Sequence, residues 1–442
     1  MRDLTASVVG WSWAMSLFGV RQTARLLAAP LSRREAAAAA DAFEAVAWQT
    51  QARFGPSLQE AFQAGDSLQR DAVDLSFAAL PRNPLAPGDW LGAGGELLGQ
   101  SWETARLWSF AGDERLAWRD IGNKVEVYRL VKRVAGVIGV PGRGEPFSLA
   151  ELVERSYALE DYPALWAVEG LGHDYAQHFW QPGEAVSGLL RDPAALGIPA
   201  KSLLMLHAGI GLGFAQPLVA RVPPDAPAEE VERVVAEVFA LCRGNSLPGD
   251  EGAAYESLGL VARSFFPTLV RPLARAVERV APELLGYYWH GAGRSTYFLP
   301  INFIPAGDPT WRPFEMALRE TPDPTALLDL FAGLGWAFTM VDIQDPEIVA
   351  RRVVGPHREA LSRTDAFSYG VATSLAMRAD TTPGAALVEG YLGYRPGGAA
   401  GAAWEALVVR PAEAFLEREY PRLRSEARLG ELFHYRPGVV SG

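Results

Sequence analysis

Cysteine, lysine and histidine are scarce in this chain of 442 residues, which contains one cysteine, three lysines and six histidines. A single cysteine excludes an internal disulfide and any zinc or iron–sulfur site built from several cysteines. Cys242 ends the apolar run VFAL, which is typical of a buried filler rather than a nucleophile. Arginine replaces lysine almost throughout, a usage typical of a GC-rich bacterial genome, and it predicts no function by itself.

Basic surface is also lacking, because the formal net charge is −11 at pH 7. No stretch of lysine and arginine is interleaved with aromatic residues, so we expect no nucleic-acid partner. Hydrophobic residues make up 49% and charged residues 21% of the chain, which predicts a globular protein. The sequence has no G-x-S-x-G, H-E-x-x-H, EF-hand, Walker A or D-D-x-x-D motif, so the sites that these motifs mark are not predicted.

The N-terminal apolar run VVGWSWAMSLFGV, residues 8–20, is too short to span a bilayer. A signal peptide is not predicted, because Arg2 is offset by Asp3 and no clear cleavage site follows. Three interpretations remain: a core helix, a helix on a membrane surface, and a helix that docks a partner. We therefore expect a cytoplasmic protein, with peripheral membrane contact through residues 8–20 as one alternative.

Apolar periodicity predicts a mainly α fold, a duplicated helical domain with few short strands. Helices are expected at 26–64, 149–158 (with Ser148 as N-cap), 162–179, 199–220, 228–242, 252–283 and 327–340. The Pro- and Gly-rich residues 80–100 predict a loop or linker, and short strands are expected at 298–305 and 338–343. Three regions follow: an N-terminal helical region (1–140), a duplicated Glu/Gly/His core (141–345) and a C-terminal helical region (346–442).

A Glu–small–Leu–Gly pattern occurs twice, around Glu169 in WAVEGLGHD and around Glu256 in AAYESLGL. After a spacer each is followed by a histidine beside Gly-x-Gly, His207 in LLMLHAGIG and His290 in YYWHGAGR. We interpret this as an internal duplication in which the two glutamates are equivalent. Superposing the Gly-x-Gly elements aligns His207 with Trp289, so the histidines are offset by one. Partial echoes at AGLGWAF and at a third VEG leave an alternative, in which the glycines only allow close helix packing.

The polar residues in these segments are the candidate catalytic groups: Glu169, His173, His207, Glu256 and His290. Glu169 and His173 are four residues apart and share a helix face, which suits either metal binding or acid–base work. A carboxylate on an apolar face, such as Glu256, has to be paired, ligated or protonated. The histidines have three further interpretations: axial ligands of a haem, acid–base groups, or core residues bonded to the backbone.

The sequence is compatible with more than one cofactor. A divalent metal ion (Mg, Fe or Mn) is one candidate and haem is a less favoured one, although the Glu-x-x-His spacing of di-metal bundles is absent. The turn-rich loop Leu241–Glu251 leads into the Glu256 segment; it either binds an anion or a metal, or is an ordinary capped helix start.

Arg294 lies four residues after His290 within an aromatic cluster. A guanidinium among aromatic rings suits the anionic head of an otherwise apolar substrate, and the alternative is a core with an arginine at its edge. The candidate substrate-binding residues are Tyr287, Trp289, Arg294 and Tyr297.

The strings VEGLGHDYA, HAGIGLGFA, CRGNSLPGDEGAAYESLGLVAR, YYWHGAGR and GLGWAFT resemble a bacterial family known as domain of unknown function 1702. The resemblance covers roughly residues 145–345 and is most specific between Glu256 and Arg294. It implies a setting in secondary metabolism, since members occur beside enediyne polyketide genes and in other natural-product clusters. It brings no catalytic residues to carry over.

Together these observations lead to one functional hypothesis and two alternatives. We expect an enzyme of bacterial secondary metabolism that acts on a large apolar polyene, polyketide or isoprenoid intermediate. An isoprenoid or polyene cyclase or lyase with an atypical acid or metal site is its more pointed form. The alternatives are a non-catalytic protein that binds haem, a pigment or a polyene, and a structural partner in a pathway complex that docks through its N-terminal run.

Overall fold

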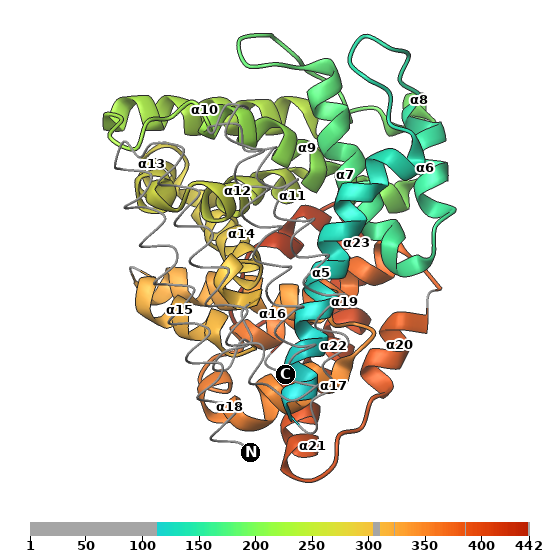
Figure 1. Cartoon of the computed structure of the whole chain (residues 1–442), viewed down its shortest axis with the longest axis vertical. Helices are drawn as coiled ribbons and strands as arrows, with labels where there is room; N and C mark the ends of the chain where they lie inside the picture. Colours follow the sequence, from blue (N-terminus) through green and yellow to red (C-terminus); the bar gives the residue numbers. More distant parts are fainter. Residues whose placement is uncertain (1–112, 304–309, 322, 385, 441–442) are drawn as a thin grey trace, which may run out of the picture. The chain divides into compact units, whose positions relative to one another are not determined.

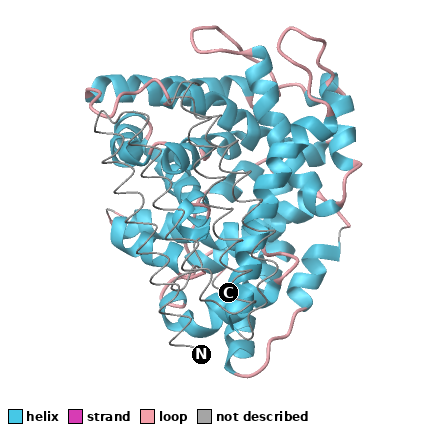
Figure 2. Ribbon diagram, viewed as in Figure 1, coloured by secondary structure: helices cyan, strands magenta, loops and turns pink. Residues whose placement is uncertain are grey.

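The computed structural model describes residues 113–440 apart from 304–309, 322 and 385, and it confirms a mainly α fold (Figure 1). Figure 2 shows helices joined by loops, without a strand in the described part of the chain. The run at 8–20, the helix expected at 26–64 and the linker expected at 80–100 lie outside the described residues.

The α-helices are α5 (Asp113–Ile138), α6 (Leu149–Tyr157), α7 (Asp161–Phe179), α8 (Pro193–Leu196), α9 (Leu203–Val219), α10 (Ala228–Asn245), α11 (Glu251–Tyr255), α12 (Ser257–Phe265), α13 (Val270–Val280), α14 (Leu285–Tyr297), α15 (Arg312–Glu320), α16 (Pro324–Val341), α17 (Pro346–Ile348), α18 (Gly355–Leu361), α19 (Ala366–Thr381), α20 (Ala386–Gly393), α21 (Ala399–Trp404), α22 (Arg410–Ala414) and α23 (Tyr420–Ser425). Short 3₁₀ or π segments join or extend them: η1 (Ala200–Ser202), η2 (Pro267–Leu269), η3 (Pro282–Leu284), η4 (Pro300–Phe303), η5 (Val349–Val354), η6 (Glu405–Val409), η7 (Phe415–Glu419) and η8 (Leu429–Phe433).

Most predicted helices are confirmed, and local sequence explains where they begin and end. Ser148 caps α6 as predicted, because its hydroxyl accepts the backbone N–H of Glu151. The helix expected at 252–283 is instead divided into α11, α12 and α13. Pro267 ends α12 because the residue before a proline is forced out of the helical region, and Phe266 has φ −131° and ψ 59°.

Both predicted strands are wrong within the described residues. Residues 300–303 form the 3₁₀ segment η4, and residues 338–341 are the last turn of α16. The helix α16 is buried on all sides and has apolar residues on every face. Its last turn therefore shows no helical periodicity of apolar and polar residues. A short apolar run of this kind cannot be distinguished from a buried strand by pattern alone.

The Gly-x-Gly elements are contacts between helices, as the packing interpretation predicted. At α7 and α9, a Cβ added to Gly209 would lie 2.1 Å from the carbonyl oxygen of Glu169, and one added to Gly172 would lie 2.4 Å from that of Leu206. Only glycine allows two backbones to approach this closely. The contact is reciprocal. Gly209 on α9 lies against the carbonyl of Glu169. Gly172, three residues after Glu169, lies against the carbonyl of Leu206, three residues before Gly209.

The same register joins five successive helix pairs in the described chain. We call the residue whose backbone carbonyl contacts the next helix the row residue of its helix. In chain order the row residues are Glu169, Ala208, Glu256, His290 and Ala332. Their carbonyls face Gly209, Ser257, Gly291, Gly333 and Gly370, respectively. Residues one and three positions after a row residue are separated by about 200° around the helix, so they face opposite neighbours. Gly-x-Gly therefore lets one helix pack closely on both sides. The predicted duplication of the domain itself stays a prediction.

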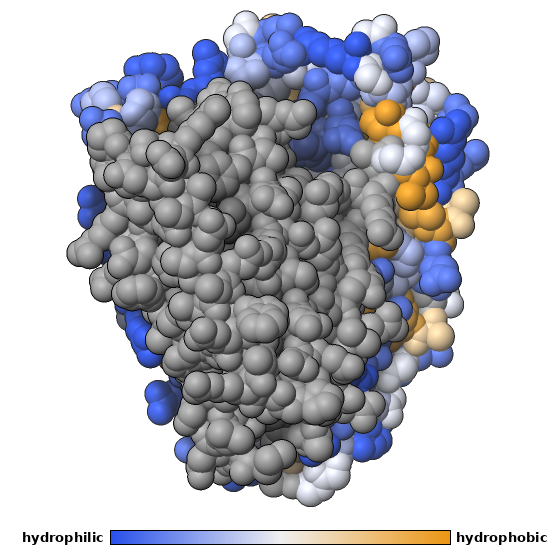
Figure 3. Space-filling model, in the orientation of Figure 1, coloured by the Kyte–Doolittle hydropathy of each residue, from blue (hydrophilic) through white to orange (hydrophobic). Residues whose placement is uncertain are grey.

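Helices from all three predicted regions pack together in one compact unit, in which α5 contacts α7 and α19 contacts α16. The division at residues 140 and 345 stays a prediction. Two helical segments, 200–219 and 324–341, are long and apolar enough to cross a membrane, but 83% and 78% of their apolar windows are buried inside the protein. The described surface in Figure 3 is mainly hydrophilic, with a short apolar strip.

Candidate acid–base site

Glu169, Glu256 and His290 are all row residues, on α7, at the junction of α11 with α12, and on α14. The glycine contacts bring these three backbones together, and Arg294 follows His290 by about one helical turn. The structure therefore gathers four of the predicted site residues into one buried cluster. All four side chains are buried, although the sequence places them up to 125 residues apart.

Arg294 lies between the two carboxylates. Its Nη1 donates to Glu256 Oε2 at 2.6 Å, and its Nη2 donates to Glu169 Oε1 at 3.2 Å. The guanidinium carbon lies 3.8 Å from the ring centroid of Trp336, which is within cation–π range. The two glutamates that the sequence marks as equivalent thus lie on either side of one guanidinium, which bridges them.

His290 is oriented by the second oxygen of the same carboxylate. Its Nδ1 lies 2.6 Å from Glu256 Oε1, so Nδ1 carries the proton that is donated to the carboxylate. The opposite nitrogen, Nε2, is buried without a hydrogen-bond partner among the described residues. An imidazole held at one nitrogen by a carboxylate and open at the other is the arrangement of a general acid or base.

The charges of this cluster leave room for one proton. Two ionised carboxylates and one guanidinium sum to −1, and a buried cluster is most stable when it is neutral. Burial raises the pKa of Glu169, while Arg294 opposes that rise and the Glu256 charge adds to it. Burial lowers the pKa of Arg294, but the two glutamates raise it more, so the arginine stays charged. The extra proton therefore belongs on Glu169, the carboxyl group whose pKa is raised.

Glu169 is the member of the cluster nearest to solvent, with 7% of its surface exposed against 0% for Glu256 and His290. Its second carboxylate oxygen is not used by Arg294. A proton exchanging with solvent therefore meets this residue first.

The other two predicted catalytic histidines lie outside the cluster. His173 is half-buried and contacts Asp174 and Gln177 rather than Glu169. Both ring nitrogens of His207 are used, because Nδ1 donates to the Leu203 carbonyl at 2.7 Å and Nε2 accepts the Leu247 N–H at 2.9 Å.

Burial lowers the pKa of His207 to about 4, so it is a neutral core residue that holds the 241–251 loop against α9. The backbone N–H of Leu247 in that loop is used in this bond. Cys242 is buried as predicted, and burial raises its thiol pKa to about 12.

The three predicted aromatic substrate contacts also separate. The ring of Tyr287 packs on Tyr255 and His434, with centroids 6.1 and 4.5 Å away. Trp289 lines a pocket on another face of α14. The hydroxyl of Tyr297 contacts Asp120 and Asp342 in a second buried cluster.

Sequence reasoning missed this second cluster. Lys124 Nζ lies 2.7 Å from Asp120 Oδ2 and 4.1 Å from the Tyr297 ring centroid, and its side chain is fully buried. Burial raises the pKa of Asp342 well above its usual range, and the nearby Asp120 adds to the rise. The signal that was available is the rarity of lysine: one of only three lysines in the chain is buried here. The cluster attaches α5 to α14 and α16.

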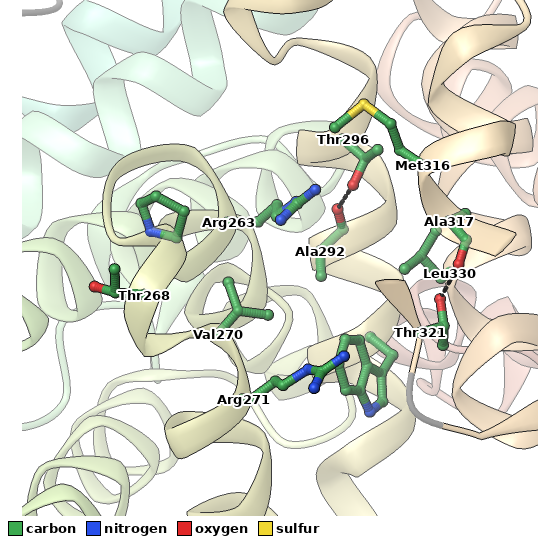
Figure 4. Close-up of a pocket in the computed structure, with 12 residues that line it drawn as sticks. Arg263, Thr268, Val270, Arg271, Ala292, Thr296, Met316, Ala317, Thr321 and Leu330 are labelled. Atoms are coloured by element: carbon green, nitrogen blue, oxygen red, sulfur yellow. Dashed lines mark hydrogen bonds between the residues drawn. The ribbon is translucent and has the colours of Figure 1, made fainter. Parts of the chain in front are cut away.

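The pocket in Figure 4 has a volume of about 200 Å³ and lies between α12, α13, α14, α15 and α16. Arg263, Arg271 and Trp289 are among its lining residues. From α14 it takes residues 289, 292 and 296, whereas the charged cluster uses 290 and 294 on a different face. The pocket is also smaller than the roughly 300–1,000 Å³ of ordinary ligand sites.

A divalent metal does not fit the charged cluster, because Arg294 already occupies the space between the two carboxylates and would repel a dication. The described residues hold no group of three or more His, Cys, Asp or Glu side chains placed to bind a metal. Haem fits no better at His207, since neither of its ring nitrogens is free to ligate iron.

No protein-family model, no curated protein and no solved structure matches this chain. The resemblance to domain of unknown function 1702 and the secondary-metabolic setting that it implies stay predictions.

Proposed function

We propose that the chain is an acid–base enzyme of bacterial secondary metabolism, and that His290 moves the proton. The observation that carries the proposal is the bond between His290 Nδ1 and Glu256, which leaves Nε2 open. Glu256 holds the ring in one orientation and stabilises its charged form. Arg294 donates to the other oxygen of Glu256, so one carboxylate is held between the guanidinium and the imidazole.

The reaction class that suits this arrangement is isomerisation or cyclisation of an apolar intermediate. The imidazolium gives its Nε2 proton to an alkene or enol carbon, and the neutral ring later takes a proton back at the same nitrogen. No net proton is consumed, and no bound metal takes part in these steps. The apolar and aromatic surroundings of the site favour a polyene, polyketide or isoprenoid as substrate. The proposed location of the protein is the cytoplasm.

We propose that a substrate approaches His290 from the side of the C-terminal segment, because an aromatic ring of that segment lies beside the imidazole. The ring of Phe433 in η8 lies 6.5 Å from that of His290, and His290 is fully buried. This segment is attached where the Tyr435 N–H donates to Asp329 and the Gly438 N–H donates to Asp365. We propose that η8 separates from α14 when a substrate binds.

The test is turnover in D₂O. The purified chain would be incubated with prenyl diphosphates, squalene-like polyenes and polyene carboxylic acids, with Mg²⁺ or with EDTA, and products would be analysed by mass spectrometry. We expect a product carrying deuterium at carbon, formed equally in EDTA. His290→Gln and Glu256→Gln should lower turnover by about 10²-fold or more, the usual contribution of a positioned acid or base.

The matched control is His173→Gln, since His173 lies outside the cluster. It should keep full turnover. Full turnover in His290→Gln, or turnover that requires Mg²⁺, would contradict the proposal. The tautomer is tested separately by ¹⁵N NMR of the imidazoles, where His290 should show a protonated Nδ1 and an unprotonated Nε2 when neutral.

A further inference from the structure

Arg378 on α19 differs from the other buried basic residues. Three lysine or arginine side chains of the described chain are buried, and two of them, Lys124 and Arg294, contact carboxylates. Arg378 is fully buried, and its Nη1 donates to the carbonyl of Asp161 at 2.9 Å. Its Nε and Nη2 have no hydrogen-bond partner among the described residues. The charge of Asp161 stabilises this guanidinium, but no carboxylate contacts it among the described residues. Buried N–H groups without an acceptor are costly, so this edge of the guanidinium calls for one.

The open atoms of Arg378 belong to one edge of the guanidinium. The N–H of Nε and one N–H of Nη2 point in the same direction, which is the fork that a carboxylate accepts with both oxygens. The face of the guanidinium is already occupied, because its carbon lies 5.5 Å from the ring centroid of Tyr162. Burial lowers the pKa of Arg378 to about 10, so the group still carries its charge at neutral pH.

Two hydroxyl side chains share this face of α19. Ser374 and Thr381 are four residues before and three residues after Arg378, which places all three within a sector of about 60°. Both are fully buried, and neither Ser374 Oγ nor Thr381 Oγ1 has a hydrogen-bond partner among the described residues. The indole N–H of Trp166 is likewise without a partner, and its ring lies 6.5 Å from that of Tyr162.

These groups are donors in excess. An arginine and an indole donate only, and a serine or threonine hydroxyl rotates to donate where an acceptor is present. Native structures satisfy nearly all buried polar atoms, so several unpaired donors beside one unpaired cation indicate a missing acceptor. Because the charge of Asp161 already acts on Arg378, a monovalent anion meets less repulsion here than a phosphate dianion.

We propose that Arg378, Ser374 and Thr381 form a buried site for a small monovalent anion of the carboxylate class. The guanidinium edge takes the two carboxylate oxygens, and one of the two hydroxyls donates to them. Ser374 and Thr381 are about 10.5 Å apart along α19, so one small anion contacts only one of them. This site is separate from the His290 cluster and does not depend on the function proposed for it.

The test measures anion-dependent stability of the full chain. Thermal unfolding would be followed in HEPES buffer with increasing sodium acetate, sodium chloride or sodium sulfate at matched ionic strength. An anion that binds only the folded state raises the unfolding midpoint according to its concentration relative to Kd. We expect a saturable rise with acetate, and a Kd from isothermal titration that agrees with it. A response to chloride equal to that to acetate would overturn the carboxylate assignment.

Variants locate the site. Arg378→Met, which keeps the volume but removes the charge, should abolish the saturable response, whereas Arg410→Met should keep it because the Arg410 side chain is 70% exposed. Either Ser374→Ala or Thr381→Val should raise the Kd for acetate by about tenfold, the effect of losing one hydrogen bond to a charged group, and the variant that does so identifies the hydroxyl in contact with the anion. These two variants carry the test if Arg378→Met does not fold. Identical acetate responses in the wild type and in these variants would overturn the proposal and assign the open donors to water.

Discussion

Gly333 offers the sharpest test of the row of glycine contacts. In Gly333→Ala, the new Cβ would lie 2.0 Å from the carbonyl oxygen of His290 and 3.0 Å from the backbone nitrogen of Arg294. The obstructing atoms are backbone, so no side chain can rotate away. The carbonyl has to retreat by about 1.4 Å to reach 3.4 Å, the short end of ordinary contact.

The expected cost follows from the movement. Overpacking a filled core costs about 1–3 kcal/mol and occasionally more, and a gap of about 1 Å already removes up to half of the dispersion energy of the contacts that it opens. The helix-propensity gain of alanine offsets only about 0.5–1 kcal/mol. We therefore expect Gly333→Ala to lower the free energy of unfolding by about 3 kcal/mol. Because α14 has to shift, the His290–Glu256 bond should be disturbed as well.

The matched control is Gly390→Ala in α20. Gly390 is exposed in a helix, and a Cβ there would meet nothing within 4 Å. Alanine should therefore raise stability at this position by about 0.5–1 kcal/mol. Urea unfolding followed by circular dichroism gives both values. The reasoning about the row would be refuted if Gly333→Ala stayed within about 0.5 kcal/mol of the wild type.

Three further predictions concern buried charges. Burial raises the pKa of Asp329 to about 7, so its folded state keeps a proton that the unfolded state releases near pH 4. Stability contributed by this group falls as the pH rises from about 4 to 7, and Asp329→Asn should be more stable than the wild type in urea at pH 8 but not at pH 4. Arg294→Met should lose about 3–5 kcal/mol in the same assay, since it leaves two buried carboxylates without their cation, whereas Arg410→Met should change little. His207 should stay neutral in ¹⁵N NMR down to about pH 4, so its contribution to stability is lost as the pH falls from about 6.5 to 4; titration near 6.5 would show that it is not buried.

Part of the candidate site could be predicted because a buried charged residue stands out in the sequence among apolar neighbours. Glu256 stands alone among small apolar residues, and such a carboxylate has to be paired somewhere in the fold. The partner could not be predicted, because Arg294 is 38 residues away and its approach depends on how α12 and α14 pack. His207 shows the opposite case, since a histidine in an apolar run looks catalytic until its two backbone partners are known.

The five row residues are equivalent in the structure, but the sequence shows this equivalence for only two of them. Glu169 and Glu256 match in the sequence because each is a glutamate followed by a small residue, a leucine and a glycine. Ala208, His290 and Ala332 hold the same position in their helices but share no side-chain chemistry with them. What they share is a backbone carbonyl against a neighbouring glycine or serine, which only coordinates show.

The sequence by itself determined the helical class, the ends of most described helices and the position of the glycines, because these depend on local propensity, capping and periodicity. It also showed that the two glutamates are unusual. Only the tertiary structure decided that Arg294 would bridge them, that His290 would be held by Glu256, and that His173 and His207 would lie elsewhere. It also decided that Arg378 would be buried with two of its guanidinium nitrogens unpaired among the described residues. These outcomes depend on the register between helices that are distant in the chain, and a one-residue change in that register turns a side chain by about 100°.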